Sequence, residues 1–359
     1  MKGKVVVGMS GGVDSSVAAY LLKEQGYDVI GITMQIWQDE DRCNIEESGG
    51  CCGLSAVEDA RRVADKLKIP YYVLNFKNEF KKNVIDYFIN EYSKGLTPNP
   101  CIACNRYVKW DSLLNRALTL GADYIATGHY ARIDKHPLTK RYTIKTANTS
   151  QKDQTYALYN LTQFQLKHTL MPVGDYEKSE IRKIAEHIGL DVANKPDSQD
   201  ICFVPDGDYA EFIRQNSNLD IKEGNFIDKS GNILGKHKGI YNYTIGQRKG
   251  LGIALGSPMY VSEIKPKTNE VVLAANDDLF KNSVIIKDFN FMGIDDINGE
   301  IFAYGKLRYS QKQSPCIIKK LDNDFVEAIF EEPQRAVTPG QAAVFYDNEY
   351  VLGGGIIYN

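Results

Sequence analysis

Near its N-terminus the chain reads Lys4-Val5-Val6-Val7-Gly8-Met9-Ser10-Gly11-Gly12-Val13-Asp14-Ser15. The β-branched run predicts a buried parallel strand. The Ser/Gly turn leads directly into a helix over 16–25 whose apolar residues share one face, with Gly26 as its stop. Glycines let backbone N–H groups converge on an anion, and the helix N-terminus adds the positive end of its dipole. The stretch therefore predicts a strand–loop–helix anion site.

The first half of the chain continues this alternation of strands and helices. Strands are predicted over 28–34, 71–76 and 124–127, and helices over 55–66, 78–94 and 106–120. Ser55 and Glu58 have the spacing of a capping box at the start of the first of these helices. This order predicts an α/β fold with an N-terminal doubly wound parallel sheet, in which ligands bind at the carboxyl ends of the strands.

The pattern changes after Pro205. A short helix is predicted over 208–215, followed by glycine-punctuated strands over 241–245, 259–264, 271–275, 283–291, 301–309, 315–320, 325–330, 342–346 and 351–358. Short, regularly spaced strands predict a small central domain and a C-terminal β-barrel. We expect three domains, with the boundaries 1–205, 206–274 and 275–359.

Composition excludes several classes of protein. The chain has 359 residues, 43% hydrophobic and 25% charged, as is typical of globular proteins. No apolar run approaches the roughly 18 residues of a membrane span, and no leader peptide is evident. The seven cysteines are an odd number, which argues against a disulfide framework. We therefore expect a cytoplasmic protein that does not bind membranes.

The net charge of −3 does not by itself indicate a nucleic-acid partner. Three local stretches are nevertheless basic and contain tyrosines, at 132–152, 236–249 and 302–321. Basic residues interleaved with aromatic residues suit a polyanion whose bases can stack. The alternative is that each stretch is an ordinary solvated face.

The cysteines raise a question of reactivity. Cys101 and Cys104 have C-x-x-C spacing just before the predicted helix at Arg106, and a helix N-terminus favours the reactive thiolate. Cys202 lies in a loop at the predicted domain boundary. These thiols are interpreted as part of a zinc site completed by Cys51 and Cys52, as inert buried groups, or as redox-active groups that handle sulfur. Cys43, Cys51 and Cys52 lie in a predicted flap over 39–53, and Cys316 is predicted to be core.

The string Ser10–Ser15 resembles the PP-loop of the N-type ATP pyrophosphatases, and it lacks the Gly-Lys-Ser/Thr of a Walker A loop. The resemblance implies that ATP is cleaved between its α and β phosphates with Mg²⁺ present. Asp14 would help to hold the loop and the metal. The implied ATP-binding residues are Gly8, Met9, Ser10, Gly11, Gly12, Val13, Asp14, Ser15, Met34 and Gly128.

Further motifs resemble the tRNA-specific 2-thiouridylases in order along the whole chain, namely Ala126–Arg132, Lys152–Tyr156, Pro196–Phe203, Tyr243–Gly250, Arg308–Tyr309 and Val337–Gln341. The resemblance implies a sulfurtransferase that acts on the wobble uridine, position 34, of tRNAs such as those for Lys, Glu and Gln. By the same resemblance, ATP would adenylate uracil O2, releasing pyrophosphate and then AMP. A persulfide on Cys202, loaded by a sulfur-relay protein or cysteine desulfurase, would supply the sulfur. Cys104 would act as a nucleophile and end in a disulfide with Cys202.

The same resemblance implies a set of tRNA-contacting residues, namely Asn99, Pro100, Cys101, His129, Lys152, Asp153, Gln154, Arg308, Tyr309 and Gln341. Some members of the family carry aspartate at the position of Cys101, so its role here stays open. Three thiols, Cys101, Cys104 and Cys202, are also enough to hold a [4Fe-4S] cluster with one open iron. The competing functions are another PP-loop ligase or tRNA thiolase and a tRNA- or nucleotide-binding protein without turnover. A monomer is expected.

Overall fold

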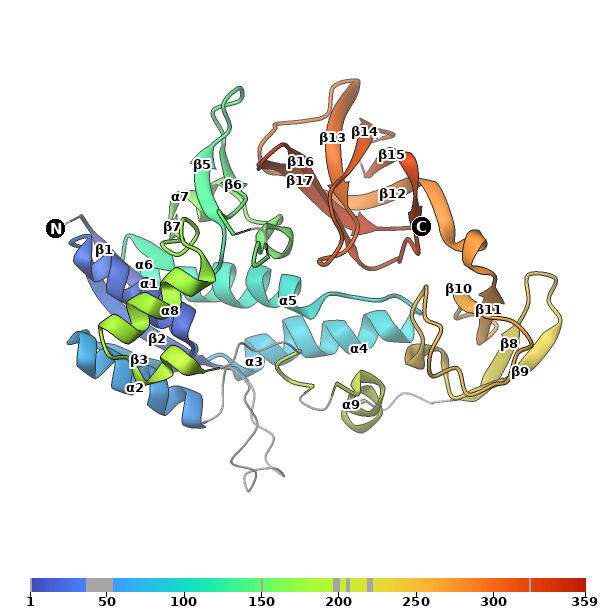
Figure 1. Ribbon diagram of the computed structural model, residues 1–359, viewed down its shortest axis with the longest axis horizontal. Helices are drawn as coiled ribbons and strands as arrows, with labels where there is room; N and C mark the ends of the chain where they lie inside the picture. The colour runs from blue at the N-terminus through green and yellow to red at the C-terminus, as the bar shows by residue number, and fades with distance from the viewer. Residues whose placement is uncertain are drawn as a thin grey trace.

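The computed structural model describes residues 2–36, 54–149, 151–195, 201–204, 207–217, 222–322 and 324–359. Figure 1 shows an α/β part that carries the N-terminus, a barrel that carries the C-terminus, and a smaller sheet beyond it. The predicted flap over 39–53, with Cys43, Cys51 and Cys52, lies outside the described residues.

The first sheet is parallel and has the strand order β3-β2-β1-β4-β7. Its strands are β1 (Lys4–Gly8), β2 (Asp28–Gln35), β3 (Tyr71–Asn75), β4 (Tyr124–Ala126) and β7 (Thr169–Leu170). The order reverses between β1 and β4, which is where open α/β sheets bind ligands. The predicted doubly wound parallel sheet is confirmed, and the loop after β1 lies at this switch point.

Helices cover both faces of this sheet. One face packs against α1 (Val13–Glu24), α2 (Leu54–Leu67), α8 (Lys178–His187) and the 3₁₀ turn η5 (Asp191–Asn194). The other packs against α3 (Lys77–Phe80), α4 (Asp86–Ser93), α5 (Pro100–Ala103) and α6 (Leu114–Thr119), with the π-helical segments η2 (Lys81–Ile85) and η3 (Cys104–Leu113) between them. Two predicted helix starts are wrong. The helix expected from Arg106 begins at Pro100, and α2 begins at Leu54, so Ser55 lies inside its first turn rather than at its cap.

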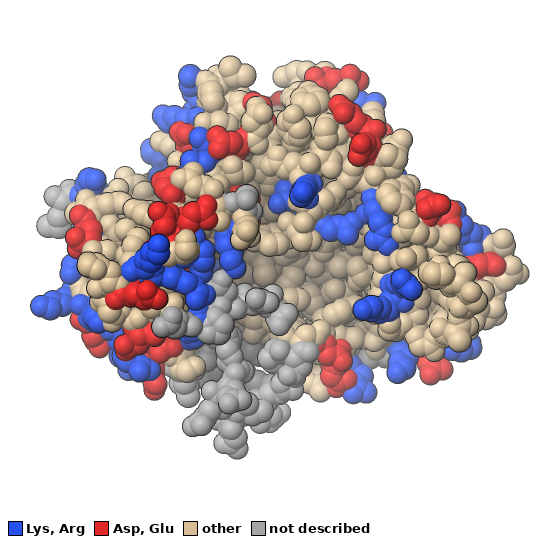
Figure 2. Space-filling model, viewed as in Figure 1, with Lys and Arg blue, Asp and Glu red and all other residues tan. Residues whose placement is uncertain are grey.

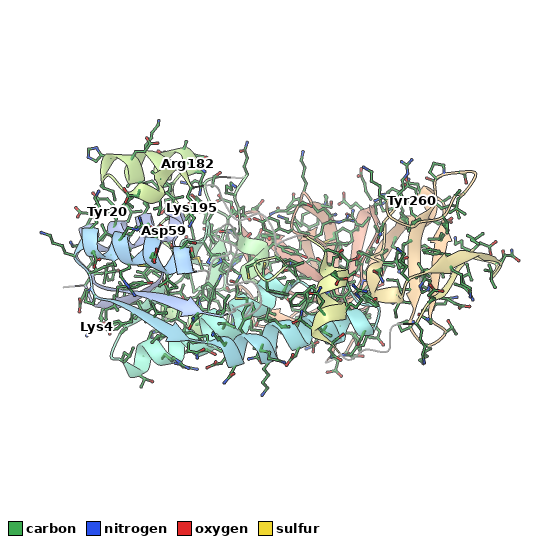
Figure 3. All side chains as sticks on the ribbon, turned by 90° about the horizontal axis from the view of Figure 1, so that it is seen from below. Lys4, Tyr20, Asp59, Arg182, Lys195 and Tyr260 are labelled. Carbon is green, nitrogen blue, oxygen red and sulfur yellow. The ribbon has the colours of Figure 1, made fainter. Side chains whose placement is uncertain are left out.

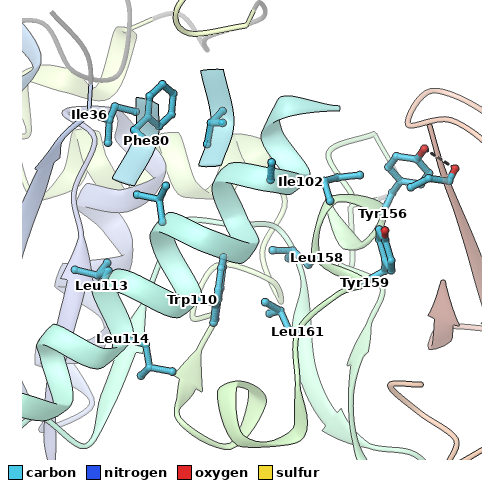
Figure 4. Packing of buried hydrophobic residues seen from close by; sticks show 14 of the residues in the cluster. Ile36, Phe80, Ile102, Trp110, Leu113, Leu114, Tyr156, Leu158, Tyr159 and Leu161 are labelled. Carbon is cyan, nitrogen blue, oxygen red and sulfur yellow. Dashed lines mark hydrogen bonds between the residues drawn. The ribbon is translucent and has the colours of Figure 1, made fainter. Parts of the chain in front are cut away.

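Short elements connect the first sheet to the rest of the chain. They are the hairpin β5 (Arg132–Lys135) and β6 (Tyr142–Lys145), the 3₁₀ turn η4 (Thr155–Leu158), and the helices α7 (Gln163–Lys167) and α9 (Tyr209–Asn216). The sequence did not predict the hairpin. Figure 4 shows Ile102, Trp110, Leu158 and Tyr159 packed between these segments and the α5–η3–α6 helix.

A four-stranded central sheet has the order β10-β11-β8-β9. Its strands are β8 (Gly224–Ile227), β9 (Ile233–His237), β10 (Tyr260–Lys265) and β11 (Glu270–Ala274), and the 3₁₀ turns η6 (Ile240–Asn242) and η7 (Asn276–Leu279) lie beside it. The strand predicted over 241–245 is wrong. Positive φ angles of 109° at Gly239 and 86° at Gly246 turn the backbone on both sides of this segment.

The C-terminal strands close into a six-stranded antiparallel barrel, as predicted. They are β12 (Phe280–Phe291), β13 (Glu300–Lys306), β14 (Ser314–Lys320), β15 (Phe325–Arg335), β16 (Ala342–Asp347) and β17 (Tyr350–Ile357). Pairing of β12 with both β15 and β17 closes the barrel. The hairpin β5–β6 joins the same sheet, because Lys145 pairs with Tyr350 of β17. The barrel is thus tied to the α/β part by backbone pairing as well as by side-chain packing.

Candidate nucleotide and tRNA thiolation site

The loop after β1 is shaped by glycine and serine. Gly11 has a φ of 70°, and a Cβ there would lie 2.4 Å from the carbonyl oxygen of Ala56, so only glycine fits. The Ser10 N–H donates to Ser15 Oγ at 3.2 Å, and Ser15 Oγ donates to the Gly12 carbonyl at 3.2 Å. These bonds hold two hydroxyl groups beside the N-terminus of α1, an arrangement suited to phosphate oxygens.

The chain that follows β4 touches this loop. A Cβ on Gly128 would lie 2.5 Å from the Ser15 backbone nitrogen and 2.6 Å from the Asp14 carbonyl carbon. Met34, on β2, pairs with Leu74 of β3 and is half-buried beside the core. The structure therefore brings Gly128 into direct contact with the loop and places Met34 near the same edge of the sheet.

Asp14 is held by residues that the sequence did not single out. Lys178 Nζ lies 2.7 and 2.8 Å from the two carboxylate oxygens of Asp14, and the Tyr130 hydroxyl donates to Oδ1 at 2.7 Å. Lys195 Nζ lies 2.8 Å from Asp59 Oδ2. Figure 3 labels these two residues, which lie near each other in that view. Lys195 Nζ also reaches the Gly11 carbonyl at 3.4 Å.

Two lysines thus place positive charge beside the predicted phosphate loop. No local motif could reveal Lys178 and Lys195, because they are 164 and 184 residues from their contacts on the loop. The loop's own carboxylate, Asp14, is already engaged by Lys178. The donor set therefore fits a Mg²⁺ held mainly by phosphate oxygens and water, as is usual for nucleotide-bound magnesium.

The helix that bears two of the thiols starts at an asparagine cap. Asn99 Oδ1 accepts the backbone N–H groups of Cys101 at 3.1 Å and Ile102 at 3.3 Å, and Pro100 occupies the first helical position. Cys101 is exposed in the first turn, whereas Cys104 is half-buried and packs against the core. The cap fixes where the helix begins and hence where Cys101 emerges.

The third thiol lies in a turn anchored on the same core. The Val204 N–H donates to the Ile201 carbonyl at 2.8 Å, which leaves Cys202 exposed and Phe203 buried. The Phe203 ring lies 5.7 Å from Phe80 and 5.4 Å from Phe88. The turn of Cys202 and the helix of Cys104 therefore share one hydrophobic cluster.

The described part of the chain contains no group of three or more His, Cys, Asp or Glu side chains that could hold a metal ion. Cys101, Cys104 and Cys202 are all within that part. In this structure these three thiols are therefore not gathered into such a group.

Thr97 joins the cysteine loop to both β parts of the molecule. Its N–H donates to the Pro339 carbonyl at 2.9 Å, its carbonyl accepts from Gln341 Nε2 at 2.8 Å, and its hydroxyl donates to Thr244 Oγ1 at 3.5 Å. The connection between β15 and β16 therefore holds the backbone that precedes Cys101, and the segment of Thr244 beside the central sheet contacts the same residue. The Gln341 amide nitrogen is engaged in this joint.

His129 and Gln154 make contacts within the protein. Thr127 Oγ1 lies 2.7 Å from His129 Nδ1, and Lys109 Nζ lies 3.5 Å from Nε2. Burial, together with the nearby Lys109 ammonium, holds the pKa of His129 well below its ordinary value of 6.5. Gln154 Oε1 accepts the Tyr130 N–H at 2.8 Å.

Asp153 and its neighbour Lys152 complete this segment. Asp153 accepts the Ala147 N–H at 3.0 Å and the Thr155 hydroxyl at 2.6 Å. Lys152 is half-buried.

The barrel supplies two more of the predicted contacts. Arg308 Nη2 donates to the carbonyl oxygens of Arg335 and Ala336, so it braces the backbone after β15. Tyr309 is 46% exposed, and its ring lies 6.2 Å from that of Tyr156. Burial raises the pKa of Tyr309, and the negative charges of Asp153 and of the Cys101 thiolate add to this shift.

These segments surround a concave face. Figure 2 shows a hollow between the α/β part, the barrel and the central sheet, with Lys and Arg at several places around it. None of the described helices is long and apolar enough to cross a membrane.

Known family models match all three parts of the chain. A family model described as "tRNA methyl transferase HUP domain" matches residues 3–206. A "tRNA methyl transferase PRC-barrel domain" matches 210–275, and an "Aminomethyltransferase beta-barrel domain" matches 281–357. A solved 4-thiouridine synthetase–RNA complex with bound ATP aligns with a TM-score of only 0.34 and 18% identity, over 59% of this chain and 50% of that one.

The curated relatives match over their full length. The tRNA-specific 2-thiouridylase of Lachnoclostridium phytofermentans is 64% identical over 354 residues, covering 99% of both chains. That of Clostridioides difficile is 59% identical over 357 residues, covering 99% of this chain and 98% of the relative. The domain descriptions name methyl transfer, but identity of this extent over whole chains is decisive. The chain therefore belongs to the tRNA-specific 2-thiouridylase family.

Proposed function

We propose that the chain is an ATP-dependent tRNA-uridine 2-sulfurtransferase that thiolates the wobble uridine, position 34, and releases AMP and pyrophosphate. The observation that supports this is that Cys104 and the turn that carries the exposed Cys202, through its neighbours Phe203 and Val204, pack on one hydrophobic cluster. The loop that resembles a PP-loop follows β1 of the adjoining sheet. The substrates are tRNAs of the Lys, Glu and Gln type, acted on by a cytoplasmic monomer. The sulfur comes from a sulfur-relay protein or cysteine desulfurase.

In the first step uracil O2 attacks the α-phosphorus of ATP. An O2–P bond forms, the α–β phosphoanhydride bond breaks, and pyrophosphate leaves with the uracil N3 proton passing to solvent. Ser10, Ser15 and the α1 N-terminus would hold the phosphates, while Lys178 and Lys195 keep positive charge beside the loop. Mg²⁺ bound with the nucleotide would supply charge neutralisation.

In the second step the terminal sulfur of a Cys202 persulfide attacks C2, and AMP leaves with the former O2. Cys104 thiolate then attacks Cys202 Sγ, forming a Cys104–Cys202 disulfide and releasing 2-thiouridine, which regains a proton at N3. Alternatively, Cys104 attacks the persulfide first and frees hydrosulfide, which displaces AMP. Both routes oxidise the two cysteines by two electrons, so a thiol reductant must reset them.

The persulfide route is preferred to an iron–sulfur route because the three thiols do not form a metal-binding group in the described structure. Cys101, exposed at the first turn of α5, would then border the target base without ligating metal. Asn99, Pro100, His129, Lys152, Asp153, Gln154, Arg308, Tyr309 and Gln341 remain the proposed tRNA-facing set. Within it, Asn99, Gln154, Arg308 and Gln341 also hold the backbone in place.

The test is thiolation of unmodified tRNA by anaerobically purified protein with ATP, Mg²⁺ and a persulfide donor. Cys202→Ser is expected to bind tRNA and abolish 2-thiouridine formation, while Cys316→Ser, a change in the barrel core, retains it. Cys104→Ser separates the two sulfur routes. If the Cys202 persulfide attacks uracil C2 directly, this variant accumulates a protein–RNA adduct that dithiothreitol cleaves, whereas the hydrosulfide route leaves no adduct.

Activity that appears only with bound iron and acid-labile sulfide would overturn the persulfide assignment. Native thiolation by Cys202→Ser would overturn the role of Cys202.

A further inference from the structure

Lys306 is the last residue of β13 and lies where the barrel meets the α/β part. Its ammonium nitrogen is 5.9 Å from the ring centroid of Tyr156 and 5.9 Å from that of Tyr309. Tyr156 belongs to η4, which contacts the helix carrying Cys101, whereas Tyr309 follows β13 in the barrel. The lysine thus sits in an aromatic corner built from both parts of the chain.

The ammonium group has hydrogen-bonding capacity left for a ligand. Within the described ranges, no carboxylate lies at ion-pair distance from Lys306. Burial lowers the pKa of Lys306, and the charge of Asp153 works against that shift. Asp153 itself accepts hydrogen bonds from Ala147 and Thr155. An ammonium carries three donors, and a partly desolvated one is stabilised by an incoming anion.

The neighbouring arginine, Arg308, binds backbone carbonyl groups of the protein. Arg308 Nη2 donates to the carbonyls of Arg335 and Ala336, so it shapes the turn that follows β15. Tyr309, by contrast, is 46% exposed and lies close enough to Cys101 for the thiol to affect its phenol. The corner therefore pairs a lysine with an exposed aromatic ring beside the cysteine loop.

We propose that Lys306 binds a backbone phosphodiester of the RNA next to the target uridine, while the exposed ring of Tyr309 stacks on a base. This inference rests on the proposed function, since it takes tRNA as the substrate. Single-stranded RNA loops are recognised in this way, by bases stacked on aromatic rings and phosphates held by basic side chains. Lys306 would position the target nucleotide and take no part in bond making.

The test compares Lys306→Met, Lys306→Arg and Lys312→Met. Lys312 is an exposed lysine in the same connection, so its substitution makes the same change of net charge. Affinity for unmodified tRNA is measured between 50 and 200 mM KCl, together with kcat and KM for thiolation. Loss of one phosphate contact makes the slope of log K against log salt shallower by about one. Between 50 and 200 mM KCl, the factor by which tRNA affinity falls should therefore be about 3.5 times smaller in Lys306→Met than in the native protein.

Lys306→Arg should restore the native slope, and Lys312→Met should leave it unchanged. KM for tRNA should rise in Lys306→Met with kcat less affected. If folded Lys306→Met has the native salt dependence of tRNA affinity and the native KM for tRNA, the inference is overturned, and the role of Lys306 is structural. Equal slope changes in the Met and Arg variants, or in Lys312→Met, would also overturn it. If Lys306→Met does not fold, Lys306→Gln serves as the neutral variant. Failure of the native protein to thiolate tRNA would instead overturn the proposed function.

Discussion

Gly128→Ala adds one methyl group where the chain after β4 touches the first turn of α1. The new Cβ would lie 2.5 Å from the Ser15 nitrogen and 2.6 Å from the Asp14 carbonyl carbon. Ordinary contact begins near 3.4 Å, so the two segments must separate by about 0.9 Å (3.4 − 2.5). Because Val17 and Ala18 of α1 are fully buried, the helix cannot shift freely, and the phosphate loop must deform.

Overpacking of this kind costs about 1–3 kcal/mol. If nucleotide binding requires the native loop shape, that cost appears as an ATP affinity reduced by about 5- to 150-fold. Calorimetric titration with ATP measures it directly, and tRNA affinity at fixed salt should stay within about twofold because the loop lies away from the barrel contacts. Gly256→Ala is the matched control, since a Cβ there meets nothing within 4 Å.

The reasoning would be refuted by native ATP affinity and native melting temperature in Gly128→Ala. It would also be refuted if Gly256→Ala weakened ATP binding equally, because steric contact would then not be the cause. Reduced stability with unchanged ATP affinity would show that the strain is relieved away from the loop.

Three further predictions follow from contacts of the site. Gln341→Ala removes the amide that holds the Thr97 carbonyl, so kcat for thiolation should fall about tenfold while ATP affinity is unchanged; equal losses in both would argue against a local effect. Asn99→Ala removes a helix cap and should lower the free energy of unfolding by about 0.5–2 kcal/mol, measured by urea denaturation, with Asn99→Asp largely retaining it. His129 has a lowered folded pKa, so only the unfolded state takes up its proton below pH 6.5 and stability falls as the medium is acidified. Comparing urea unfolding of native protein and His129→Gln at pH 7 and 5.5 should show a smaller loss in the variant, and an equal loss would contradict the assignment.

Much of the α/β part could be predicted because its signals are local. The β-branched run of β1, the glycine-rich turn and the apolar face of α1 are each complete within a few residues, and the structure follows them. The hairpin β5–β6 was missed because its residues are mostly polar and basic, and its stability depends on β17, far along the chain.

The wrong or missing sequence predictions also concern features that depend on residues far apart in the chain. The segment Tyr241–Ile245 has strand-forming residues, but glycines with positive φ on each side and burial of Tyr241 and Tyr243 favour a 3₁₀ turn. At the site, residue types in the PP-loop motif were readable, whereas Lys178 and Lys195 were not. Their contacts depend on packing across the fold, which one sequence does not display.

The burial of Tyr156 has a consequence for synthesis of the protein on the ribosome. This side chain is fully buried, and its hydroxyl donates to the Ala342 carbonyl, 186 residues later in the chain. At about 5–20 residues per second, the ribosome needs about 10–40 s to make that distance. Throughout this interval the nascent α/β part exposes apolar residues that pack with the barrel in the folded protein, in the cluster that joins Tyr156 to Val344 and Tyr346. A chaperone that covers these apolar residues during translation should therefore raise the yield of native protein more than one added after release.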